Sequence, residues 1–333
     1  MFSRLTARVA LAVLALVVIG FALFFTRTGN PLGKETADGD MYTEAVQVPL
    51  DLREELVAET VSAPAPDYLI TLQNAADWMR ENNPNPQVGS VGGEWAVVAL
   101  ARAGVDDDDW FERYLLSLDA ALAGEGGRVE RMTDYARVTL ALTALGLDAS
   151  NYSGHDLTAA LRTFIPHEDR PGYNRTVNAD IFALIALDSR PFDGDREAYI
   201  AAILAAEAPS GGWGLSTGPT PDITAMAIQA LAPYYARDAD VRAAIDRALL
   251  LLGDQPMPDA EGNAQMIVAH TALGRDATHY VEALLTFREV ETGAFMRVGD
   301  PNMMATEQVA YALVAHDRFV RGVSRLYDMA GGN

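Results

Sequence analysis

The feature that most constrains this chain is an alanine-rich helical segment that recurs about every 42 residues. Six copies begin at residues 94, 136, 178, 222, 264 and 307, so the steps between them are 42, 42, 44, 42 and 43 residues. Between successive copies lies a second segment, such as 238–252, whose apolar residues follow helical spacing and whose charges gather on one face. A period of this size is typical of arrays in which each repeat is one supersecondary unit. The sequence therefore predicts an all-α fold built from helix pairs.

The two helices of each pair differ in charge, and this difference predicts where each of them lies. The recurring segments carry few charged residues over ten positions, so we expect them to be buried nearly all round. The amphipathic segments should face water, and they are predicted at 67–82, 109–122, 155–164, 195–206, 238–252 and 277–287. Six pairs that close on themselves have no exposed ends of the kind that an open solenoid must cap. We therefore expect residues 67–333 to form an (α/α)6 toroid of six helix hairpins, with an inner and an outer ring.

The best-preserved copy of the repeat begins with the turn Ser210-Gly-Gly-Trp-Gly. Pro221 and Asp222 suit the first turn of the following helix, and Pro233 marks its end. Because weaker copies of this turn precede other inner helices, we expect its glycines and Trp213 to be structural. The alternative is that the tryptophan belongs to an aromatic wall that faces a flat or apolar ligand.

The N-terminus carries an apolar run of 17 residues, 9–25, preceded by Arg4 and Arg8. This is the lower end of the length that spans a bilayer, and no small-residue cleavage site follows it. We expect residues 1–27 to be an uncleaved signal-anchor, with a cleaved signal peptide (hence a secreted protein) or a buried helix as alternatives. The basic N-terminal flank predicts a single-pass cell-membrane protein with a cytoplasmic N-terminus and an extracytoplasmic toroid. Residues 28–66 are acidic and contain several Pro and Gly, so they are predicted to be a linker.

Charge and composition exclude several classes of partner and site. The formal net charge of −21 argues against nucleic acid, whose phosphates require a basic surface. Cysteine is absent, which excludes disulfides, thiolate nucleophiles and Cys-ligated zinc. The five histidines show no paired metal-binding spacing. We therefore expect neither a metal nor another cofactor.

Three motifs carry a family resemblance: Gly-Gly-Trp before an inner helix, Ala-Gln-x-x-x-Ala-x-x-Ala-Leu-Gly at 264–274, and Met-Ala-Thr-Glu-Gln-x-x-Tyr-Ala-Leu-x-Ala at 304–315. On these motifs the chain resembles the prenyltransferase/squalene-cyclase repeat superfamily, the terpenoid cyclase-like α/α toroids. It is most similar to bacterial extracytoplasmic members related to the helical domain of intrinsic factor and transcobalamin. The resemblance covers residues 67–333 and implies a ligand site in the cavity mouth, near the N-termini of the inner helices. The ligand expected there is a corrinoid or other tetrapyrrole, a terpenoid, or a glycan.

The chain departs from the catalytic branches of that superfamily. Residues 106–109 match the Asp-x-Asp-Asp string of class II terpene cyclases, but they follow the helix stop at Gly104 and are predicted to cap the next, outer helix. Protein prenyltransferases use a cysteine for zinc, which this chain lacks. Toroids with a thioester carry Cys before a Glu-Gln pair, whereas Thr306 precedes Glu307 here. These departures predict a domain without catalytic residues.

Inner-helix N-termini meet at one end of a toroid, so the polar and aromatic residues there are candidates for ligand binding. They are Glu94, Trp95, Asp134, Asn178, Asp180, Trp213, Asp222 and Glu307. Acidic residues at helix starts commonly cap the helix, but two carboxylates facing one cavity can also act as general acid and base. The leading hypothesis is a membrane-anchored extracytoplasmic domain that binds a small molecule or a protein partner. The alternative is a terpenoid cyclase-like or glycan-cleaving enzyme that uses paired carboxylates at the mouth.

Overall fold

The computed structural model describes residues 66–124, 129, 131–170 and 176–331. Among these residues no helix has both the length and the apolar character needed to cross a membrane. The predicted anchor at 1–27 and nearly all of the predicted linker lie outside the described residues. The described helices belong to one compact unit, Pro64–Asn333.

The prediction of an all-α fold is confirmed. The described part of the chain contains twelve α-helices and one short antiparallel pair, β1 (Met296–Arg297) and β2 (Asp300–Pro301). The helices with the recurring alanine-rich sequence are α4 (Glu94–Ala103), α6 (Met132–Ala144), α8 (Val177–Ser189), α10 (Pro221–Leu231), α12 (Ala260–Ala272) and α14 (Met303–Val320). They alternate with α3 (Asp67–Asn82), α5 (Asp108–Ala123), α7 (Ala159–Arg162), α9 (Arg196–Ala205), α11 (Ala239–Leu252) and α13 (Thr278–Leu285).

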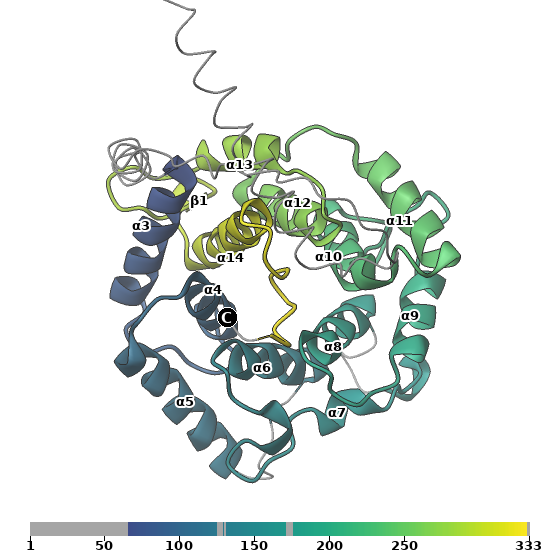
Figure 1. The fold of residues 1–333 in the computed structure, drawn as a ribbon, viewed down its shortest axis with the longest axis horizontal. Helices are drawn as coiled ribbons and strands as arrows, with labels where there is room; N and C mark the ends of the chain where they lie inside the picture. Colours follow the sequence, from purple (N-terminus) through teal and green to yellow (C-terminus); the bar gives the residue numbers. More distant parts are fainter. Residues whose placement is uncertain (1–65, 125–128, 130, 171–175, 332–333) are drawn as a thin grey trace, which may run out of the picture. The chain divides into compact units, whose positions relative to one another are not determined.

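The alanine-rich helices pack in the order of the chain and return to their start. Helix α4 packs on α6, α6 on α8, α8 on α10, α10 on α12, α12 on α14, and α14 packs on α4 again. In Figure 1 these six helices lie in the middle of the unit, with the other six outside them. Small alanine side chains allow this close approach of backbones. The contacts therefore link six consecutive helix pairs in a closed circuit.

Burial follows the division that the charge pattern predicts. Helix α8 is buried on every side, as shown by Ile181, Phe182, Ala183 and Leu184, which follow one another around the helix. Helix α11 instead buries a single stripe, made of Val241, Ala244, Ile245 and Ala248. That spacing of three and four residues places the stripe on one face, so the opposite face meets water.

The sequence predicts the outer helices well, with one exception. The helix predicted at 155–164 is only the four-residue α7, because Asp156 accepts hydrogen bonds from the backbone N–H and hydroxyl of Thr158 and holds a turn there. Residues 106–109 do cap the next outer helix: Asp107 accepts a hydrogen bond from the Trp110 N–H at 3.1 Å. The acidic string is thus a helix N-cap.

The turn before α10 is held by a buried tryptophan and a threonine. Trp213 is fully buried and its Nε1 donates to the Ile203 carbonyl at 2.6 Å, while its backbone N–H donates to Thr224 Oγ1 at 3.0 Å. Glycine is needed here, because Gly212 has φ +76° and a Cβ on Gly214 would lie 1.8 Å from the Gly218 carbonyl oxygen. Trp213 therefore has a structural role, because it packs between two consecutive repeats and fixes the turn that joins them.

The same arrangement returns before α14 with a different aromatic residue. Phe295 is fully buried, and its backbone N–H donates to Thr306 Oγ1 at 2.9 Å, across the same separation of eleven residues. Each threonine lies in the first turn of the helix that its turn precedes. A buried aromatic residue followed by Thr at the eleventh position is thus a repeated structural device of this fold.

Residues 321–331, here called the C-terminal segment, run between the inner helices in Figure 1, and residues 325–328 lie beside the C-terminal ends of α8, α10 and α12. Leu326 and Met329 are buried, and the Met329 N–H donates to the Ser189 carbonyl at 2.9 Å. Tyr327 reaches the inner helices and its ring lies 6.5 Å from that of Trp95. The segment therefore closes one end of the space that the inner helices surround.

Arg102 on α4 fixes this segment through its backbone. Its guanidinium donates to the carbonyls of Leu326, Arg325 and Asp328 at 3.0, 3.0 and 3.1 Å. The side chain is almost completely buried, and this burial lowers its pKa to about 10. A single cation thus satisfies three carbonyl groups that would otherwise need water.

Replacing Arg102 with alanine should lower the free energy of unfolding by about 3 kcal/mol, because buried carbonyls lose a charged donor. We expect the C-terminal segment to become accessible to protease before the rest of the unit, which limited proteolysis with mass spectrometry would detect. Arg113→Ala is the matched control, since Arg113 donates to one carbonyl, that of Pro84, at the surface. Equal effects of the two substitutions would contradict the role given to Arg102.

Candidate mouth cavity

A cavity of about 290 Å³ lies where the inner helices begin. Five of the six alanine-rich helices contribute to its wall, each through residues in its first three turns or at its N-cap. The lining residues are Trp95, Arg131, Thr133, Arg137, Asn178, Phe182, Ile223, Met226, Gln308 and Tyr311. We call this space the mouth cavity.

One part of the mouth cavity is aromatic. The ring of Trp95 lies 5.2 Å from that of Phe182 and 5.7 Å from that of Tyr311, both tilted against it. Trp95 is half-buried, so part of its ring remains open to the cavity. Rings at these distances pack favourably with one another and offer flat apolar surface to a ligand.

The polar part of the wall combines two arginines with two side-chain amides, those of Asn178 and Gln308. Both guanidiniums interact with Asp134, and Arg137 also lies 3.9 Å from Glu94 Oε2. Their positive charge is therefore largely balanced. Asn178 Oδ1 is buried and has no hydrogen-bond partner among the described residues. A buried acceptor without a partner costs free energy.

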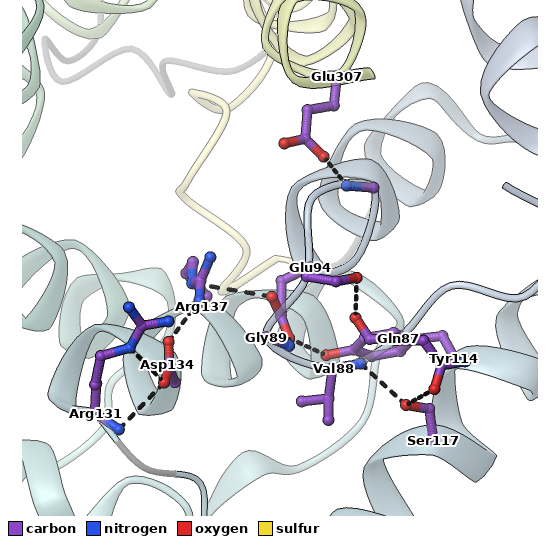
Figure 2. Close-up of polar contacts among 12 residues, drawn as sticks. Gln87, Val88, Gly89, Glu94, Tyr114, Ser117, Arg131, Asp134, Arg137 and Glu307 are labelled. Carbon is purple, nitrogen blue, oxygen red and sulfur yellow. Dashed lines mark hydrogen bonds and ion pairs between the residues drawn. The ribbon is translucent and has the colours of Figure 1, made fainter. Parts of the chain in front are cut away.

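The predicted carboxylates Glu94 and Glu307 hold the loop before α4 (Figure 2). Glu94 Oε1 accepts from the Gly89 N–H, and Glu307 Oε2 accepts from the Gly92 N–H, both at 2.7 Å. Both side chains are almost fully buried. Burial raises the pKa of Glu94, and it raises the pKa of Glu307 to about 8, helped by the nearby charge of Glu94. These two carboxyl groups therefore tie the N-terminal ends of α4 and α14 to one loop.

Asp134 and Asp180 are both paired with basic side chains. Asp134 Oδ2 accepts from the backbone N–H of Arg131 at 3.2 Å and from its Nε at 3.0 Å, as Figure 2 shows. Asp180 is fully buried between His167 and Arg170, and its Oδ1 lies 2.7 Å from the Arg170 guanidinium. Neither residue lines the mouth cavity. Both carboxylates bind basic side chains next to inner helices.

The eight predicted site residues therefore fall into separate groups. Trp95 and Asn178 line the mouth cavity. Asp222 is exposed and lines a neighbouring cavity beside the N-terminal ends of α10, α12 and α14, whereas Trp213 is buried and lines neither cavity. The four buried carboxylates, Glu94, Asp134, Asp180 and Glu307, do not line the mouth cavity.

Sequence reasoning missed most of the wall, in particular Arg137, Phe182, Gln308 and Tyr311. A signal for them existed, because Phe182 and Tyr311 lie four residues after Asn178 and Glu307 and therefore on the same helix faces. Arg137 likewise follows Asp134 by one turn. Extending the candidates by one helical turn would have found Arg137, Phe182 and Tyr311, but not Gln308, which directly follows Glu307.

Among the described residues no group of three or more His, Asp or Glu side chains could hold a metal ion. Comparison with protein-family models and with curated proteins gives no match to this chain.

Proposed function

We propose that the unit is an (α/α)6 toroid that binds a small molecule in the mouth cavity without transforming it. The closed circuit of inner-helix contacts and the alternation of buried and amphipathic helices support the toroid. The observation that carries the binding function is the mouth cavity itself, whose wall combines the rings of Trp95, Phe182 and Tyr311 with the side-chain amides of Asn178 and Gln308. Aromatic surface with a few converging polar groups is the usual composition of a ligand site.

The wall favours one class of ligand. Trp95, Phe182 and Tyr311 suit a flat apolar face, while the amides and guanidiniums suit hydrogen-bonding groups on the edge of the same molecule. Because carboxylates balance the positive charge of the arginines, the wall does not favour a strongly charged ligand. We therefore propose a ring-shaped polar molecule with one apolar face, such as a saccharide. A corrinoid or an extended terpenoid would also need space beyond the 290 Å³ of this cavity.

An enzyme with paired carboxylates has less support. Glu94, Asp134, Asp180 and Glu307 all bind protein groups, and none of them lines the mouth cavity. A glycosidase mechanism needs two carboxyl groups that face the bond to be broken. The arrangement therefore favours binding over catalysis.

Calorimetric titration of the full-length chain with a saccharide panel, an isoprenoid alcohol and cobalamin tests the ligand class. We expect saturable binding of a saccharide, and the substitution Asn178→Ala should weaken it by about tenfold, through loss of one buried hydrogen bond. Trp95→Phe should also weaken binding, since it removes aromatic surface. Asn85→Ala changes an exposed asparagine outside the cavity and should leave affinity unchanged. Binding that is insensitive to both cavity substitutions would contradict the proposed site.

We further propose that the toroid is extracytoplasmic and anchored by residues 1–27. The basic residues before the apolar run support this orientation. Protease added to intact spheroplasts should then digest the toroid, whereas protection of the toroid until the membrane is opened would contradict the orientation.

A further inference from the structure

A second, larger cavity of about 800 Å³ lies beside the mouth cavity, and Met226 and Gln308 line both. Four methionines from four different elements surround it. They are Met226 on α10, Met257 before α12, Met296 on β1 and Met304 on α14. We call this space the methionine groove. All four side chains are only half-buried, although methionine is more often found inside a protein.

The methionine groove is both apolar and adaptable. Methionine side chains are unbranched and polarizable, so they re-pack around apolar groups of different shapes, and surfaces rich in them bind varied partners. Phe287 adds an aromatic ring to the wall, and Val298, at the tip between β1 and β2, is 98% exposed. An apolar side chain left so open at the rim of a cavity extends the apolar surface outward. This surface is larger than the ring-shaped ligand of the mouth cavity requires.

The charges along the groove are predominantly negative. Asp222, Asp259 and Glu261 line it, against one cation, Arg297. That arginine is already paired with Glu261, with 2.9 Å between Nε and Oε1. The uncompensated charge along the groove is therefore acidic and would attract a cationic partner.

We propose that the methionine groove is a docking site for an apolar, positively charged peptide segment of a partner protein. Apolar side chains of the segment would enter the groove between the four methionines, as when an amphipathic helix binds a hydrophobic groove. Lysine or arginine side chains at its edge would face Asp222 and Asp259. The site is separate from the ligand function of the mouth cavity and does not depend on it.

The test is fluorescence anisotropy of the full-length chain with a labelled amphipathic peptide of leucine and lysine, about four helical turns long. A matched peptide with glutamate in place of every lysine controls for apolar character alone. We expect the lysine peptide to bind and to weaken as salt is raised, and the glutamate peptide to bind far more weakly.

Substitutions that line only the groove then locate the site. Met257→Gln and Met296→Gln keep side-chain length but bury an amide, so each should weaken the lysine peptide by about tenfold. Asp222→Asn should weaken it less and reduce its salt dependence. Leu250→Gln is the control for nonspecific stickiness, because Leu250 is 85% exposed on α11, outside the groove.

Thermal melts followed by circular dichroism establish that each variant is folded before its affinity is compared. Equal binding of the two peptides, or unchanged affinity in both methionine variants, would overturn the proposal. Occupation of the groove by a small apolar dye that the lysine peptide fails to displace would overturn it as well.

Discussion

Replacing Trp213 with alanine should lower the free energy of unfolding by about 3–5 kcal/mol, the range for a large aromatic side chain removed from a core. The side chain is fully buried between α9 and α10, and it loses its hydrogen bond to the Ile203 carbonyl as well as its packing. Urea denaturation followed by far-ultraviolet circular dichroism measures this change. The native affinity for the mouth-cavity ligand should persist at low temperature, because Trp213 does not line that cavity.

Two companion substitutions separate packing from hydrogen bonding at this turn. Trp213→Phe retains an aromatic ring, like the one that Phe295 supplies before α14, and should cost only about 1–2 kcal/mol. Leu215→Ala alters an exposed residue of the same turn and should change stability by less than about 0.5 kcal/mol. If Trp213→Ala lowered the free energy of unfolding no more than Leu215→Ala, the buried Trp213 side chain would not be what holds this turn between α9 and α10.

The helical fold could be predicted from the sequence because every helix pair repeats the same pattern of buried and exposed residues. Small and apolar residues on every side of an inner helix such as α8 leave no face for water, whereas α11 buries one apolar stripe at 241, 244, 245 and 248. These patterns are local, so a single sequence contains them. The position of α7 was harder to predict, because the turn at Asp156 competes with the helix through a side-chain hydrogen bond.

The site was less predictable because its residues meet only through tertiary packing. Helix starts indicated Trp95 and Asn178, which line the mouth cavity, but they also indicated Glu94 and Asp180, whose side chains bind a loop and Arg170 instead. Which way a side chain at a helix start points depends on its neighbours in space. The C-terminal segment also has no copy elsewhere in the chain. The repeat pattern therefore could not predict that Arg102 donates hydrogen bonds to its carbonyl groups.

The contribution of Glu307 to stability should fall as pH rises from about 5 to 8, and this contribution should disappear in Glu307→Gln. Burial raises the pKa of Glu307 from 4.5 to about 8, so between these values the folded protein holds a proton that the unfolded chain has released. Raising the pH then favours unfolding by about 1.4 kcal/mol per pH unit. The stability that this group contributes is complete below its unfolded pKa and is lost as pH passes its folded pKa.

Glutamine is the informative replacement because it remains neutral and can still accept the hydrogen bond from the Gly92 N–H. Urea denaturation at a series of pH values should give a shallower dependence for the variant, which becomes more stable than the native chain above about pH 8. Some slope should remain, since burial also raises the pKa of Glu94. Asn85→Ala changes an exposed residue that does not titrate and should leave the native slope intact. Parallel curves for Glu307→Gln and the native chain would instead mean that Glu307 is ionised in the folded state. The loop before α4 would then be held by a buried charge rather than by a neutral carboxylic acid.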